Sequence, residues 1–89
     1  MKIKSGFIVE KVGSRYLAVA VGERADDFNA LIRMNGTGAF IWNSLAECNR
    51  SEEELVGLLV SEFDVSRERA AADVSAFVTR LAEAGLLDE

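Results

Sequence analysis

The segment "NALIRMNGTGAFIWNSL", residues 29–45, decides how this sequence folds. Apolar and polar residues alternate from Phe28 to Met34, and this period of two is typical of a β-strand. Beyond Asn35 the apolar residues recur at helical spacing instead; they are Ile41, Trp42 and Leu45. The sequence therefore predicts a strand over residues 28–34 that leads directly into a helix over residues 36–47.

Asn35 stands at the junction between the predicted strand and the predicted helix, and it is a suitable helix N-cap. Its side-chain oxygen can accept a hydrogen bond from an otherwise unpaired amide of the first helical turn. Gly36 and Gly38 follow it, and glycine adopts backbone conformations that other residues avoid. We therefore expect the two glycines to let the chain turn sharply out of the strand.

Two further β-rich runs precede this segment, "FIVEKV" at residues 7–12 and "RYLAVAV" at residues 15–21. Between them, Gly13-Ser14 is typical of a two-residue hairpin turn. A polar connection, "GERADD" at residues 22–27, leads from the second run to the third. The sequence thus predicts three antiparallel strands before the first helix.

A second helix is predicted within "SEEELVGLLVSEF", residues 51–63. It opens with a capping box, in which Ser51 is the cap and Glu54 stands three residues later. Its apolar stripe consists of Leu55, Leu58, Leu59 and Phe63.

A third helix is predicted over residues 67–84, with Ser66 as its cap. Gly85 stands where a left-handed residue commonly ends a helix. Three helices can cover one face of a three-stranded antiparallel sheet. The predicted fold class is therefore α+β, in a single domain over residues 1–89.

The composition argues against several classes of site. The 89-residue chain has no histidine and one cysteine, Cys48, so the commonest metal ligand and base is missing and a CxxC zinc site cannot form. No apolar run approaches the roughly 18 residues of a membrane span. We therefore expect no enzyme activity, no cofactor or metal, and no membrane partner. A lone cysteine cannot form an internal disulfide, and the expected compartment is the cytoplasm.

The charges are divided unevenly along the chain. Residues 1–34 carry six Lys/Arg and four Asp/Glu, whereas residues 35–89 carry four and eleven, which gives net charges of +2 and −7. Phosphate contacts are made mainly by Lys and Arg, so the acidic half argues against a nucleic-acid partner. The third predicted helix also has no positive excess, unlike a DNA-reading helix. A winged-helix DNA-binding protein stays as an alternative hypothesis.

Two surfaces are candidates for binding a partner. The third predicted helix carries a second stripe beside its apolar face, formed by Arg69, Asp73, Ala76 and Arg80. The third predicted strand, if it lies at the edge of the sheet, has unpaired amides and carbonyls that can accept another chain. A solvated helix face and an ordinary exposed strand give the same patterns, so periodicity alone leaves both interpretations open.

Residues 34–42, "MNGTGAFIW", resemble the "LN-x-T/S-G-x-x-I-W" segment of PqqD-like proteins, a family named for a small protein of pyrroloquinoline quinone biosynthesis. The resemblance continues through "SEEELVGLL" (51–59), "DVSAFVTRL" (73–81) and "AGLL" (84–87). It covers residues 30–88, with the three strands in the expected order. Met34 stands where the family usually has leucine.

The resemblance implies a winged helix-turn-helix-like fold and a role in recognising ribosomally synthesised precursor peptides. Such domains bind the leader of the precursor as an added strand along the third strand, in a cleft closed by the third helix. They deliver the precursor to a modifying enzyme, such as a radical SAM protein or a lasso-peptide protease or cyclase, and are not catalysts themselves. A scaffold that binds only its partner enzyme is the other alternative. Whether the chain forms a homodimer through its exposed strand stays open.

The same resemblance implies a peptide site on the third strand and the third helix. Main-chain hydrogen bonds to the leader are expected from Asn29, Ala30, Leu31, Ile32 and Arg33. Apolar leader side chains would enter pockets lined by Leu31, Ala76 and Phe77, although Phe77 could equally belong to the core. Arg69 and Arg80 would meet acidic groups of the leader, and Asp73 would hold an arginine or another leader group.

Overall fold

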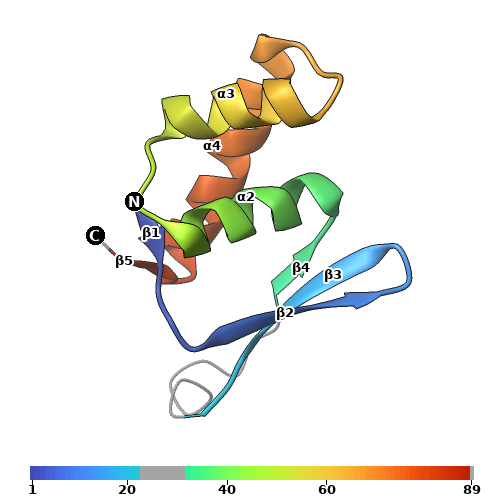
Figure 1. Ribbon diagram of the computed structural model, residues 1–89. Helices are drawn as coiled ribbons and strands as arrows, with labels where there is room; N and C mark the ends of the chain where they lie inside the picture. The colour runs from blue at the N-terminus through green and yellow to red at the C-terminus, as the bar shows by residue number, and fades with distance from the viewer. Residues whose placement is uncertain (23–31, 89) are drawn as a thin grey trace.

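The computed structural model describes residues 1–22 and 32–88 of the chain. In chain order its elements are β1 (Lys2–Ile3), β2 (Phe7–Val12), β3 (Arg15–Ala20), β4 (Ile32–Met34), α2 (Gly36–Glu47), α3 (Glu52–Glu62), α4 (Arg67–Glu83) and β5 (Leu87–Asp88). The antiparallel sheet β2-β3-β4 is followed by three helices, which cover one of its sides (Figure 1). The predicted α+β fold class is confirmed. Residues 28–31 of the predicted third strand lie outside the described residues.

β2 and β3 form the predicted hairpin, in register from Phe7 opposite Ala20 to Val12 opposite Arg15. Gly13 occupies the turn with φ +63°, a left-handed conformation that glycine adopts without strain. β4 pairs with β3, with Ala18 opposite Ile32. β4 is therefore the last strand of this sheet, and no described strand pairs with its other edge.

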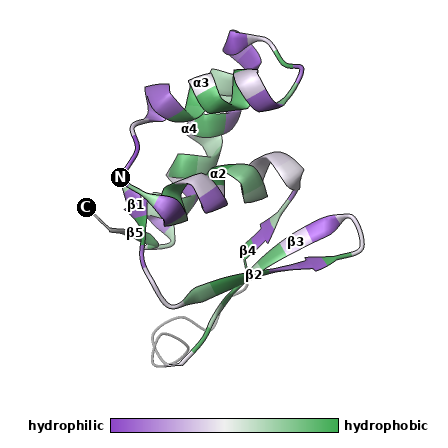
Figure 2. Ribbon diagram, in the orientation of Figure 1, coloured by the Kyte–Doolittle hydropathy of each residue, from purple (hydrophilic) through white to green (hydrophobic). Residues whose placement is uncertain are grey.

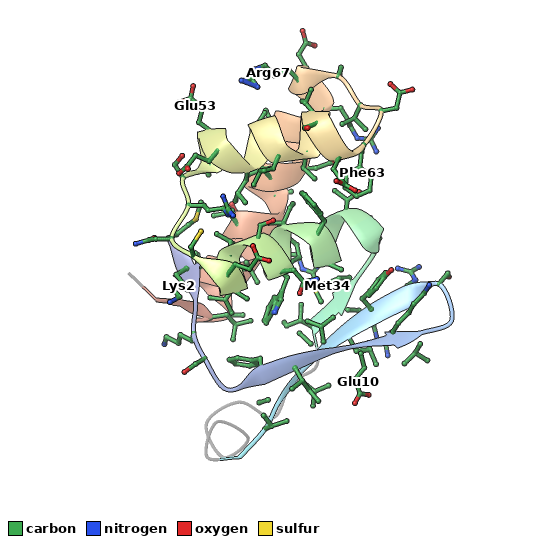
Figure 3. The ribbon with its side chains drawn as sticks, in the orientation of Figure 1. Lys2, Glu10, Met34, Glu53, Phe63 and Arg67 are labelled. Carbon is green, nitrogen blue, oxygen red and sulfur yellow. The ribbon has the colours of Figure 1, made fainter. Side chains whose placement is uncertain are left out.

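The two faces of the sheet differ in their surroundings. On the inner face, Ala18 and Met34 are buried against the helices. Figure 3 shows the labelled Met34 between the sheet and α2, whereas Glu10 points away from the helices. The outer face is open to solvent and still carries apolar residues, among them Ile8 and Val12, which are 44% and 57% exposed.

The core lies between the sheet and the three helices, and α2 is its centre. Ile41, Trp42 and Leu45, the stripe predicted for the first helix, are each at most 2% exposed. The Trp42 ring meets Phe7 edge to face, with ring centroids 5.7 Å apart. Figure 2 shows apolar and polar residues on each helix, as expected for helices with one buried side.

Local capping residues fix the helix boundaries where the sequence predicts them. The side chains of Asn35, Ser51 and Ser66 each accept a hydrogen bond from a first-turn amide of α2, α3 and α4 respectively. The capping box of α3 is complete, because Glu54 accepts from the backbone N–H of Ser51 at 2.9 Å. This hydrogen bond lowers the pKa of the Glu54 carboxyl below its ordinary value of 4.5.

A second, two-stranded sheet joins the two ends of the described chain, and the sequence analysis missed it. β1 and β5 are antiparallel, with Ile3 opposite Leu87. The backbone N–H of Lys4 extends the pairing by donating to the carbonyl of Leu86 at 3.0 Å. Leu86 is 2% exposed, so this closing segment also adds to the core. None of the described helices combines the length and the apolar composition that crossing a membrane requires.

Candidate peptide-binding site

A cavity of about 240 Å³ opens between β4, the first turns of α2, and α4. It is lined by Arg15, Arg33, Met34, Asn35, Thr37, Gly38, Ile41, Asp73, Ala76, Phe77 and Arg80. Small-molecule sites usually enclose roughly 300–1,000 Å³. The cavity is therefore the size for one or two side chains of a larger partner rather than for a whole cofactor.

The apolar part of the cavity is made by core residues. Met34, Ile41 and Phe77 are 2%, 1% and 6% exposed, so each belongs to the core and also lines the cavity. Ala76 comes from an exposed position of α4. The Phe77 ring is thus buried in the core, and part of it also faces the cavity; its contact with a leader stays a prediction.

Gly38 allows close packing between α2 and α4. The expectation that Gly36 and Gly38 let the chain turn sharply out of the strand is wrong. Neither glycine has a positive φ, and the turn out of β4 is made by Asn35 in an extended conformation. A Cβ atom on Gly38 would lie 3.2 Å from the Phe77 ring and 3.3 Å from the Met34 Cβ, whereas one on Gly36 would meet no atom within 4 Å. The missing side chain of Gly38 lets α4 approach the start of α2.

Charged groups form the rim of the cavity. The Arg80 guanidinium lies over the Phe77 ring, 5.9 Å from its centroid, and donates a hydrogen bond to the backbone carbonyl of Arg33 at 3.1 Å. Asp73 pairs with Arg69 at 3.4 Å, one turn away on α4. Arg69 does not line the cavity, and its side chain is 72% exposed.

The Arg80 hydrogen bond reveals how the edge of β4 is oriented. Because the Arg33 carbonyl is turned toward α4, it points away from β3. In an antiparallel ladder the N–H and C=O of one residue point to the same side. Arg33 therefore presents both a donor and an acceptor at the free edge of β4, directly beside the cavity.

The structure brings together about half of the predicted site. Arg33, Asp73, Ala76, Phe77 and Arg80 all line the cavity. Ile32 lies in β4 without lining it, and Arg69 reaches it only through Asp73. Asn29, Ala30 and Leu31 lie outside the described residues.

Sequence reasoning did not place six of the lining residues in the site: Arg15, Met34, Asn35, Thr37, Gly38 and Ile41. Arg15 begins β3, two residues before Leu17, which is the partner of Arg33. Only the register of the sheet places Arg15 beside β4, and the sequence carries no signal for it. In the described part of the chain, no group of three or more His, Cys, Asp or Glu side chains could hold a metal ion.

Comparison with known proteins identifies the family. The family described as "Coenzyme PQQ synthesis protein D (PqqD)" matches residues 17–87. This chain belongs to the PqqD family. The PqqD match contains every residue that lines the cavity except Arg15. No curated protein matches the sequence at a significant level.

Two solved structures share the fold of this PqqD-family chain. One is "TbiB1 in Complex with the TbiA(beta) Leader Peptide", with a TM-score of 0.72, 24% identity, and coverage of 99% of this chain and 95% of that one. The other is "Lasso peptide synthetase B1 complexed with the leader peptide", with a TM-score of 0.67, 24% identity, and coverage of 96% and 93%. The α+β fold is thus the one that these two proteins have.

Proposed function

We propose that this chain binds the leader segment of a ribosomally synthesised precursor peptide and presents the precursor to a modifying enzyme. The observation that carries the proposal is an edge of β4 with which no described strand pairs, beside a cavity with an apolar floor and a charged rim, between β4 and α4. The two similar structures support it, because both are complexes with leader peptides.

In this proposal the leader adds to the sheet as a strand next to β4. Arg33 offers the first pair of main-chain hydrogen bonds, through its N–H and its carbonyl. Pairing would continue toward residues 29–31 rather than past Asn35, because the carbonyl of Asn35 already accepts from the N–H of Ala39 at 2.9 Å. The main chain would supply affinity that is largely independent of the leader sequence.

Side chains of the leader would supply the specificity. Residues of an added strand alternate between its two faces, so every second leader side chain would face α4. One of these would enter the cavity, in contact with Phe77 and Ala76. The cavity volume of about 240 Å³ suits a single large apolar or aromatic side chain.

Leader binding requires no catalysis by this chain. The enzyme that receives the precursor would carry out its chemical modification. That enzyme would be a radical SAM protein or a lasso-peptide protease or cyclase. A dimer formed through β4 would compete with leader binding for the same edge.

The test uses the synthetic leader of the precursor encoded nearest this gene, with binding measured by calorimetry. A series of leaders carries one N-methyl group each, which removes one main-chain donor at a time. Strand addition predicts that alternate positions lose affinity, with a period of two. Equal affinity for every N-methylated leader would refute strand addition.

The cavity is tested by filling it from α4. Ala76 is exposed and lines the cavity, so Ala76→Tyr should reduce leader affinity by more than tenfold without unfolding the protein. Ala71→Tyr is the matched control, since Ala71 is also exposed on α4 but does not line the cavity. Equal effects of the two substitutions would place the leader elsewhere.

A further inference from the structure

The cavity rim is a basic surface on an acidic protein. Its lining contains three arginines, Arg15, Arg33 and Arg80, and one acid, Asp73. The lining therefore has a net charge of +2, whereas the whole chain has a net charge of −5. Within residues 1–22 and 32–88, none of the three arginines forms an ion pair with a carboxylate. The one acid of the rim is already paired, because Asp73 contacts Arg69. The positive charges of the three guanidinium groups are therefore not neutralised by any carboxylate of the described residues at this place, although the guanidinium of Arg80 donates to the carbonyl of Arg33.

The three arginines come from three different elements, and the fold brings them together. Leu17 of β3 is opposite Arg33 of β4, so Arg15 and Arg33 lie on the same face of neighbouring strands, two residues apart in register. Arg80 reaches the same point from α4, where its guanidinium donates to the carbonyl of Arg33. All three also line one cavity.

We propose that Arg15 and Arg33 form a carboxylate-binding site that selects leaders with an acidic side chain next to the apolar residue that fills the cavity. This inference rests on the proposed leader binding. The position of the acid follows from strand geometry: if one leader residue faces α4, its neighbour faces the outer side of the sheet, where the side chains of Arg15 and Arg33 lie.

Arg80 has a different part. In the structure its guanidinium donates to the acceptor that an incoming strand needs, the carbonyl of Arg33. A leader amide would take over that acceptor, and the released guanidinium, which comes from the α4 side of the leader strand, would stay over the Phe77 ring. Arg15 and Arg33, on the outer side, would bind the leader carboxylate, because guanidinium and carboxylate groups match each other in a bidentate geometry.

The experiment measures leader affinity by calorimetry, again with the synthetic leader of the nearest precursor gene. Each Glu and Asp of the leader is changed singly to Gln or Asn, and every peptide is measured against the unchanged protein, Arg15→Gln and Arg67→Gln. One amide peptide should bind the unchanged protein about tenfold more weakly, which is the loss expected for a charge-assisted hydrogen bond. Arg15→Gln should reduce this discrimination to less than twofold, as a double-mutant cycle reveals.

Arg67→Gln is the matched control, because Arg67 is an exposed arginine of α4 that neither lines the cavity nor pairs with Asp73. It should keep the full tenfold discrimination. If all amide peptides bind within twofold of the unchanged leader, or if Arg67→Gln removes the discrimination, the carboxylate site is refuted while leader binding stands. If the unchanged leader does not bind, the proposed function fails and this inference fails with it. Fluorescence of the single tryptophan, the buried Trp42, verifies that each variant is folded.

Discussion

The contrast between Gly36 and Gly38 provides a sharp test of the packing around the cavity. Both residues lie in the first turn of α2, and neither has a positive φ. Substitution by alanine should therefore give both positions a similar gain in helix propensity, about 0.5–1 kcal/mol. The two sites differ only in what the new methyl group meets.

At Gly38 the new methyl group meets three atoms that have little freedom to move. They are Cε1 of Phe77 at 3.2 Å, Cβ of Met34 at 3.3 Å and Oδ1 of Asn35 at 3.4 Å. Phe77 and Met34 are buried, and the Asn35 oxygen already accepts the capping hydrogen bond from the N–H of Gly38 at 2.8 Å. Overpacking of this kind costs about 1–3 kcal/mol.

Subtracting the propensity gain leaves Gly38→Ala destabilised by about 1 kcal/mol, whereas Gly36→Ala should be stabilised by up to about 1 kcal/mol. For a domain of this size, each kcal/mol corresponds to a change of about 4–8 °C in Tm. Urea denaturation followed by Trp42 fluorescence measures both free energies of unfolding. If Gly38→Ala stabilises the protein as much as Gly36→Ala does, the close contact of Gly38 with Phe77 and Met34 is refuted.

Three further predictions concern the rest of the fold. Gly85 follows α4 with φ +73°, so Gly85→Ala should lower the free energy of unfolding by about 1–2 kcal/mol in urea denaturation, because left-handed backbone disfavours a Cβ. The pKa of Glu54 is lowered in the folded protein, chiefly by the hydrogen bond from the backbone N–H of Ser51. The ionised carboxylate therefore stabilises the fold at pH values above the ordinary pKa of 4.5. This stabilisation is lost as the pH falls through the lowered pKa of the folded protein. The stability difference between the unchanged protein and Glu54→Gln, measured by urea denaturation at a series of pH values, should therefore shrink on acidification; a constant difference would contradict the role of the ionised carboxylate. Cys48 is exposed at the C-cap of α2, so Cys48→Ser should change the free energy of unfolding by less than about 0.5 kcal/mol, and a larger loss in the same assay would reveal a packing role for the thiol.

The features that the sequence predicted well are local ones. Asn35, Ser51 and Ser66 each act on amides within the next three residues, so their types and spacing are enough to place the helix starts. The hairpin turn at Gly13 is equally local. The family resemblance also depended on spacing within continuous segments, and the PqqD match confirmed it.

The features that the sequence did not predict depend on contacts between distant segments. β1 and β5 are two residues each, too short for any periodicity, and they pair across almost the whole chain. Gly38 lacks a side chain where α4 packs closely against α2, and the sequence does not say where the two helices meet. The sequence therefore could not show that this glycine provides space for packing rather than backbone flexibility. Arg15 lines the cavity because of the register between β3 and β4. The sequence alone does not determine this register.

The hydrogen bond from Arg80 to the carbonyl of Arg33 has a consequence for solubility as well as for recognition. A sheet edge that can receive one strand can in principle receive any strand, including the same edge of another molecule, and such contacts lead to aggregation. Each intruding strand must first displace a guanidinium that is also held over the Phe77 ring. A stray strand whose side chains do not fit the cavity would gain less than a matched leader, so the displacement of Arg80 discourages the wrong strand more than the right one.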